Sequence, residues 1–142
     1  MRWGIPGRRA AGGRPVTNVR NLESPFWRPL LGRAARVLVP VSAFCEWSAA
    51  ADPETGRKRA VWFTLRDRPL FAFAGLFRPG ADGAPPRYAF LTAPPNRLVG
   101  AVHPRAMPVI LDDADADTWL GGAPAEAFQR PFPEERMRIL ND

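Results

Sequence analysis

The sequence predicts a single α+β domain, mixed and strand-rich, in which short helices flank a β-sheet core. Its 142 residues suffice for one sizeable core, and 46% of them are hydrophobic while 24% are charged, as is typical of globular domains. Short apolar stretches rich in β-branched and aromatic residues recur along the chain, and segments rich in Gly and Pro separate them. These observations place all of residues 1–142 in one strand-rich domain.

The clearest predicted strand covers residues 36–47, Arg-Val-Leu-Val-Pro-Val-Ser-Ala-Phe-Cys-Glu-Trp. Pro40 cannot donate a hydrogen bond to a neighbouring strand, so we expect a sheet edge or a bulge there. Further strands are predicted where an apolar run lies between turn-forming residues: 60–65, 70–77, 87–92, 107–111 and 136–140. A polar hairpin loop at 52–59, a tight connection at 66–69 and a Gly- and Pro-rich loop at 79–86 separate them.

The predicted helices are all short. Ser24-Pro25 is typical of an N-cap followed by Pro in the first turn, which predicts a helix over 24–32. Residues 112–120 begin with acidic side chains and end at Gly121-Gly122, in agreement with the polarity of the helix dipole. Two shorter helices are expected at 94–102 and 124–129.

Composition excludes several classes of function. No apolar run approaches the ~20 residues that span a bilayer, and the first residues lack the apolar core of a signal peptide. One cysteine and one histidine cannot form a disulfide or a zinc site. Phosphate-binding and hydrolase-elbow motifs are absent from the sequence. We therefore expect a cytoplasmic monomer with no metal, no cofactor and no membrane contact, and a nucleoid-associated location if the basic composition reflects a nucleic-acid partner.

The charge is strongly basic, with a net charge of +6 and a pI of about 11.1, and Lys58 is the only lysine. Arginine suits phosphate contacts and stacking on bases, which favours a nucleic-acid partner. GC-rich coding DNA also enriches Arg without any function, so both explanations remain open. The segment 7–16, rich in Gly, Arg and Pro, is either a mobile phosphate-contacting loop or a plain surface loop.

Three segments place polar residues in apolar surroundings. His103 precedes an apolar run and lies near Arg105, which suits a proton shuttle beside an anionic ligand, although an ordinary satisfied imidazole is the alternative. Glu46 ends an apolar strand, where a carboxylate is costly unless it is paired with an arginine or used in chemistry. Asn18 lies in a loop, where it either caps a turn or contributes to a site.

Together these segments resemble the SRAP family, the SOS response-associated peptidases, which are also called abasic-site processing proteins. The resemblance extends in order from the first residues to about residue 120. It rests on these matches: Trp3-Gly4-Ile5-Pro6, Asn18-x-Arg20-x-x-Glu23, Val37-Leu38-Val39-Pro40, Phe44-x-Glu46-Trp47, Ala74-Gly75-Leu76-Phe77, Leu91-Thr92, His103-x-Arg105 and Met107-Pro108-Val109-Ile110-Leu111.

The resemblance implies an SRAP-like β-sheet or barrel core and a function. The family binds single-stranded DNA at abasic sites and forms a covalent crosslink, in which the sugar aldehyde reacts with the α-amine and thiol of a cysteine that follows the initiator methionine. A peptidase or lyase label is also implied. Carried over by motif, Asn18 would hold the reacting nucleotide or the N-terminal residue, Glu46 would act as the acid–base carboxylate, and His103 would assist ring opening. The implied DNA contacts are Trp3, Arg20, Arg28 and Arg105.

The chain departs from the family at its start, because residue 2 is Arg and not Cys. The Trp-Gly-Ile-Pro motif also comes first here, whereas in the family it lies some tens of residues along. We expect the domain to be N-terminally truncated, either because the gene start was placed at an internal Met, which the intact motifs favour, or because this is a degenerate copy. In either case we expect no crosslinking from the chain as it stands.

Two alternatives to an abasic-site protein remain open. One is a non-catalytic, Arg-rich single-strand DNA-binding remnant. The other is a thiol hydrolase that uses Cys45, His103 and Asn18 or Asn21, which requires the thiol and the imidazole to lie within hydrogen-bond reach. Strand alternation predicts that Glu46 lies close to His103 while Cys45 points to the opposite face.

Overall fold

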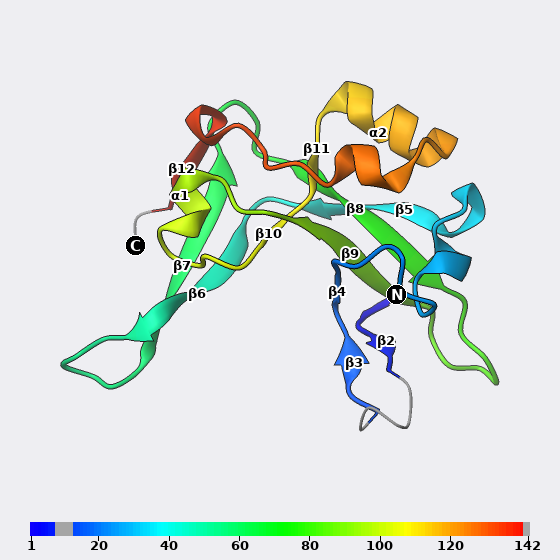
Figure 1. The fold of residues 1–142 in the computed structure, drawn as a ribbon, viewed down its shortest axis with the longest axis horizontal. Helices are drawn as coiled ribbons and strands as arrows, with labels where there is room; N and C mark the ends of the chain where they lie inside the picture. Colours follow the sequence, from blue (N-terminus) through cyan, green and yellow to red (C-terminus); the bar gives the residue numbers. More distant parts are fainter. Residues whose placement is uncertain (8–12, 141–142) are drawn as a thin grey trace.

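The strands form two main sheets and one small ribbon in the computed structural model, which describes residues 1–7 and 13–140 (Figure 1). The centre of the seven-stranded sheet is the antiparallel pair of β8 (Phe71–Arg78) and β9 (Arg87–Ala93). Five further strands extend it along these two: β1 (Arg2–Trp3), β4 (Asn18–Val19), β5 (Arg36–Val41), β10 (Met107–Pro108) and β11 (Ile110–Leu111).

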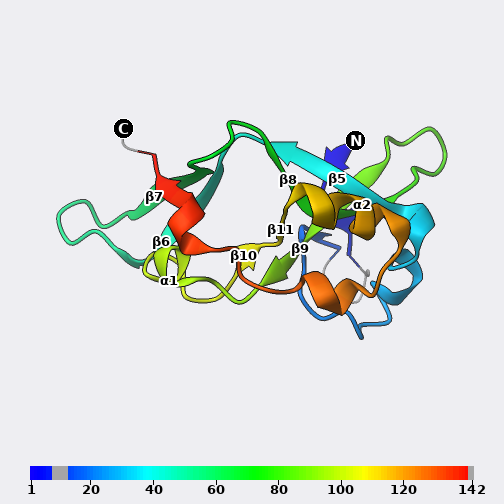
Figure 2. The ribbon, with the colours of Figure 1, turned by 90° about the horizontal axis from the view of Figure 1, so that it is seen from above.

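The second sheet has the strand order β12-β7-β6. Its strands are β6 (Phe44–Ala51), β7 (Lys58–Leu65) and β12 (Met137–Ile139). The β6–β7 hairpin projects from the rest of the molecule in both views (Figures 1 and 2). The ribbon pairs β2 (Ile5–Pro6) with β3 (Pro15–Val16).

Short helices surround the sheets. The longest, α2 (Asp113–Gly121), packs against β5, β8 and β11 (Figure 2). The others are α1 (Arg97–Gly100) and the 3-10 turns η2 (Arg28–Leu30), η3 (Arg33–Ala35), η4 (Ala125–Phe128) and η5 (Glu134–Arg136). Neither α-helix of the described residues has the length and apolar composition of a membrane span. The predicted α+β class is confirmed, and the described strands form open sheets rather than a closed barrel.

The two main sheets are joined by a cluster of phenylalanines. Phe44 of β6 stacks on Phe63 of β7 at 5.3 Å between ring centroids, and it meets the edge of Phe73 of β8 at 5.8 Å. All three side chains are buried. A separate hydrophobic cluster lies beneath α2 and includes Trp119 and Leu76. The molecule therefore has two cores, one between the sheets and one under the helix.

The predicted strand 36–47 is two strands in the structure. β5 pairs with β8, ending at Val41 opposite Phe71, whereas β6 begins at Phe44 and pairs with β7, so the chain changes sheets at Ser42-Ala43. Pro40 lies in β5, which pairs only with β8 among the described strands, so the prediction of a sheet edge at Pro40 is confirmed.

The predicted helix over 24–32 is wrong. The segment forms turns, in which the Phe26 N–H donates to Ser24 Oγ at 3.3 Å, followed by η2 and η3. Pro29 explains the difference, because it has no N–H to continue an α-helix and it disfavours helical geometry at Arg28 before it.

Three other predicted elements are shorter than expected. The helix over 94–102 reduces to α1, which begins after Asn96 caps the Val99 N–H at 2.9 Å. The strand over 107–111 divides at Val109, whose N–H donates to Leu91 of β9 while its carbonyl accepts from Ala74 of β8. The strand over 136–140 reduces to β12. Half of the basic loop predicted over 7–16 falls on residues 8–12, which lie outside the described residues, whereas its last two residues form β3 instead of a loop.

A buried arginine ties β5 to the helices. Arg36 donates from Nε to the Leu31 carbonyl at 2.9 Å and from Nη1 to the Trp119 carbonyl at 3.0 Å. Its guanidinium lies 4.1 Å from the centroid of the Trp119 ring. Burial lowers the pKa of Arg36. The hydrogen bonds and the cation–π contact offset the cost of burying this charge.

We expect Arg36→Ala to lower the free energy of unfolding by about 3 kcal/mol, because two carbonyls lose a charged donor and the Trp119 ring loses its cation. Urea denaturation followed by tryptophan fluorescence measures the loss. Arg33→Ala, at an exposed position nearby, is the matched control and should change stability by less than about 0.5 kcal/mol. Equal stabilities of the two variants would contradict this account.

Candidate functional site

A cleft of about 570 Å³ lies between the two main sheets, above the phenylalanine cluster. The seven-stranded sheet contributes Trp3, Asn18 and Phe90 to its wall, and the three-stranded sheet contributes Glu46, Trp47 and Trp62. His103 closes it from the connection after α1. The structure thus brings together Asn18, Glu46 and His103, which the sequence analysis had selected from segments far apart in the chain.

Glu46 and His103 lie side by side on the cleft wall. His103 Nδ1 lies 3.8 Å from Glu46 Oε2, and their side chains are 30% and 23% exposed. Burial raises the pKa of the Glu46 carboxyl, and the nearby charge of His103 partly opposes this. Glu46 is therefore poised to hold a proton more readily than an exposed carboxylate. The predicted proximity of these two residues is confirmed.

Local structure explains why these two side chains meet. Along β6, Glu46 is two residues beyond buried Phe44, so both side chains leave the same face of the strand. The last turn of α1 brings the chain round, because the N–H groups of Val102 and His103 both donate to the Val99 carbonyl. The Ala49 N–H then donates to the Val102 carbonyl at 2.9 Å, which ties β6 to this connection.

Trp3 and Asn18 occupy the opposite wall. Both belong to two-residue strands that pair in parallel with β9, where Trp3 is opposite Tyr88 and Asn18 is opposite Phe90. The Trp3 ring stacks on Phe90 at 5.6 Å with an interplanar angle of 13°, yet the residue remains 54% exposed. One face of the indole is thus supported by protein while much of the ring stays accessible.

Two of the three predicted phosphate-contacting arginines lie together. Arg20 donates from Nη1 to the Arg105 carbonyl, and the Arg20 carbonyl accepts from Gln129 Nε2 at 2.9 Å. Both arginines are exposed, and Arg105 is two residues beyond His103 of the cleft wall. Arg28 is also exposed and lies in η2, and none of these three arginines is among the residues that line the cleft.

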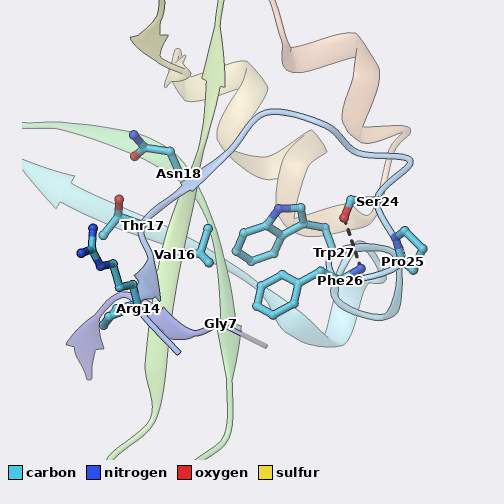
Figure 3. Close-up of a pocket in the computed structure, with 10 residues that line it drawn as sticks. Gly7, Arg14, Val16, Thr17, Asn18, Ser24, Pro25, Phe26 and Trp27 are labelled. Atoms are coloured by element: carbon cyan, nitrogen blue, oxygen red, sulfur yellow. Dashed lines mark hydrogen bonds between the residues drawn. The ribbon is translucent and has the colours of Figure 1, made fainter. Parts of the chain in front are cut away.

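A second hollow, here called the hairpin hollow, adjoins the cleft at Asn18 (Figure 3). Its volume is about 590 Å³, and Arg14 lies on one side of it while Phe26 and Trp27 lie on the other. Sequence reasoning assigned no site here, although the basic segment containing Arg14 was a signal. The sequence analysis also did not select Trp47 and Trp62 as site residues, although they are 56% and 47% exposed. Only the alternation of side chains along their two strands could have indicated this exposure.

Cys45 does not have the properties of a nucleophile. Burial raises the pKa of its thiol, and the charge of Glu46 raises it further, whereas reactive cysteines have a lowered pKa. Cys45 nevertheless belongs to the lining of the cleft, although the sequence predicted that it would point away. Among the described residues, no group of three or more His, Cys, Asp and Glu side chains is placed to hold a metal ion.

The structure is thus that of an α+β protein with a glutamate–histidine contact in a cleft between two sheets. The model of the SOS response associated peptidase (SRAP) family matches residues 1–141, and the chain belongs to this family.

Three solved structures share the fold. A protein from Bordetella bronchiseptica is 26% identical with a TM-score of 0.75, and the match covers 97% of this chain and 74% of that one. A protein from Bacteroides thetaiotaomicron is 23% identical with a TM-score of 0.74, over 96% and 66% of the two chains. A phage-related protein from B. bronchiseptica is 22% identical with a TM-score of 0.69, over 97% and 68%.

The chain thus spans about two thirds to three quarters of the length of these three structures. The comparison with curated proteins gave no significant match.

We expect Glu46→Gln to stabilise the protein at neutral pH relative to the wild type. Because burial raises the folded-state pKa of Glu46, its contribution to stability is complete at low pH and is lost as the pH rises through that pKa. The variant's advantage should therefore grow between about pH 4 and 7. Urea denaturation across this range measures it, with Glu54→Gln at an exposed hairpin position as the control. An advantage that is constant with pH would contradict this assignment.

Proposed function

We propose that this chain binds single-stranded DNA at abasic sites and that its cleft receives the sugar that lacks a base. The observation that carries the proposal is the juxtaposition of the Glu46–His103 pair with Asn18 in one cleft between two sheets. An abasic sugar interconverts between a closed hemiacetal and an open aldehyde, and this reaction needs proton transfer at two oxygens. Membership of the SRAP family supports the same assignment.

Charge and aromatic surface support DNA as the partner. The net charge of +6 attracts a polyanion, and exposed Arg20 and Arg105 are suited to the phosphates on either side of the abasic sugar. Neighbouring bases can stack on the accessible faces of Trp3 and Trp47, because stacking requires only a π-face and not a particular base. Asn18, with an amide that both donates and accepts, would hold the sugar between these contacts.

In the proposed ring opening, the proton that Glu46 accepts from the sugar is balanced by the proton that His103 donates to it. The Glu46 carboxylate takes the proton of the sugar's C1′ hydroxyl, the C1′–O4′ bond breaks, and protonated His103 donates to O4′, which gives the open aldehyde and a 4′ hydroxyl. The raised pKa of Glu46 makes it an effective base, and the resulting neutral pair regains its starting state by proton exchange between the two side chains or with water.

We propose non-covalent binding by residues 1–142. A thiazolidine requires an amine and a thiol on the same terminal residue, and the only cysteine of the chain, Cys45, has its amine within a peptide bond. The raised pKa of the Cys45 thiol also argues against a thiolate-dependent peptidase or hydrolase activity. An oligonucleotide adduct that survives denaturing electrophoresis would overturn this part of the proposal.

Binding should depend on salt and on exposed arginines such as Arg105, which is two residues beyond His103 of the cleft wall. We expect Arg105→Glu to weaken binding of an abasic oligonucleotide about tenfold at low salt and to reduce the slope of log K against log salt concentration by about 1. Fluorescence anisotropy measures both quantities. Arg33→Glu places the same charge change on an exposed site in η3 and should have a much smaller effect. If both variants weaken binding equally, the effect is one of net charge and the assignment of Arg105 fails.

Acid–base chemistry is tested separately from binding. The wild-type protein should accelerate the reaction of an abasic oligonucleotide with an alkoxyamine, which captures the open aldehyde. His103→Gln should reduce this acceleration about 100-fold while leaving affinity within about twofold, because the neutral amide cannot donate a proton at neutral pH. Binding without any acceleration by the wild type would favour a non-catalytic DNA-binding remnant. Absence of binding would overturn the proposed function.

A further inference from the structure

The outer face of the three-stranded sheet carries an exposed tryptophan beside a basic hollow. Trp62 and Thr64 are two residues apart on β7, so their side chains leave the same face of the sheet. Arg138 of β12 is directly opposite Thr64 and therefore shares that face. Trp62 is 47% exposed, and Arg138 is exposed as well. An aromatic surface and a cation are thus neighbours on a sheet face that the proposed chemistry does not use.

The hollow beside Trp62, here called the sheet hollow, has a volume of about 460 Å³. Ser42, Arg66 and Arg138 contribute polar groups to it, and Ala43 belongs both to this hollow and to the cleft. Trp62 also lines the cleft. The cleft and the sheet hollow are therefore adjacent, and they meet where the chain crosses from β5 to β6.

The charge in the sheet hollow is unevenly compensated. Arg68 on its wall is held by Asp112 at 2.6 Å and by Asp113 at 2.9 Å. Asp67, its acidic member, is bound by Arg136 at 2.6 Å. Among the described residues, the Arg66 side chain donates one hydrogen bond, from Nε to the Met137 carbonyl at 2.8 Å.

Within the described residues, neither Arg66 nor Arg138 forms an ion pair. The hollow therefore presents two arginines that pair with no carboxylate of residues 1–7 and 13–140.

We propose that Trp62 and the sheet hollow form a subsite for nucleotides that flank the abasic site, so that the DNA strand leaves the cleft across the outer face of the β12-β7-β6 sheet. This inference rests on the proposed function. One base stacks on the Trp62 indole, and the next phosphate binds Arg138 and Arg66. The guanidinium groups match the geometry of phosphate oxygens, and Ser42 provides a hydroxyl donor at the edge.

Charge complementarity favours DNA over a protein segment as the occupant. An apolar peptide would leave the two arginines desolvated without a partner, which is costly. A single DNA strand satisfies both features of the face, because each nucleotide provides an anion and a π-face at a regular spacing.

The test measures how affinity depends on oligonucleotide length. Each fluorescein-labelled strand carries one abasic site. The flank on one side of this site has a fixed length, and the flank on the other side is varied from zero to six nucleotides. One set of strands varies the 5′ flank and a second set varies the 3′ flank. For the wild type we expect affinity to rise at least fivefold with length in one polarity. Arg138→Glu and Trp62→Ala should each abolish most of this gain. Arg138→Glu, whose side chain belongs to the sheet hollow and not to the cleft lining, should bind the shortest strand as the wild type does. Arg33→Glu, on the far η3 surface, should keep the gain.

Every outcome is decisive. If the shortest strand binds but length adds nothing in either polarity, or if both variants keep the full gain, the flanking subsite is wrong and the proposed function stands. If the wild type binds no abasic strand, the proposed function fails and this inference fails with it. Circular dichroism checks the fold of each variant, and Arg138→Glu, at an exposed position, keeps the test valid should Trp62→Ala fail to fold.

Discussion

Contact between phenylalanines of the two main sheets is the constraint on which the candidate site depends. Phe44 and Phe63 of one sheet pack on Phe73 of the other, and this buried cluster fixes the separation and angle of the sheets. The cleft is the continuation of the same junction toward solvent, where polar residues replace the phenylalanines. Because Glu46 follows Phe44 on the same face of β6, the position of the carboxyl is set by core packing rather than by a flexible loop.

The same junction accounts for the electrostatics of the site. A carboxyl beside an aromatic core loses hydration, which raises its pKa, and the charge of an imidazole at 3.8 Å partly opposes this shift. Cys45 experiences the same desolvation and lies beside the same carboxyl, and for a thiol both effects oppose ionisation. One environment thus favours proton transfer at Glu46 and disfavours nucleophilic attack by Cys45. This contrast separates the acid–base hypothesis from the thiol-hydrolase hypothesis.

Sequence patterns predicted the strands well, because alternation and β-branched residues reflect local preferences. They predicted the helices poorly where a single proline decided the outcome, as Pro29 does at 24–32. The division of 36–47 between two sheets was not predictable from this largely apolar run, since only tertiary pairing separates Val41 from Phe44. Asn18, Glu46 and His103 were selected as polar residues in apolar segments, and the family resemblance supplied the roles expected of them. Trp62 and Arg138 were missed because their adjacency depends on pairing between β7 and the distant β12.

The structure also distinguishes arginines with a structural role from the others, which composition alone could not do. Arg36 is buried against Trp119, while Arg68, Arg130 and Arg136 bind carboxylates, so these residues have a structural role whatever the origin of the arginine enrichment. Base composition of the coding DNA would scatter the remaining arginines without regard to the cleft. Arg20 and Arg105 instead meet near it, and Arg66 and Arg138 share the adjoining hollow. The proposed binding of an extended anionic ligand would account for this grouping, which codon usage alone does not predict.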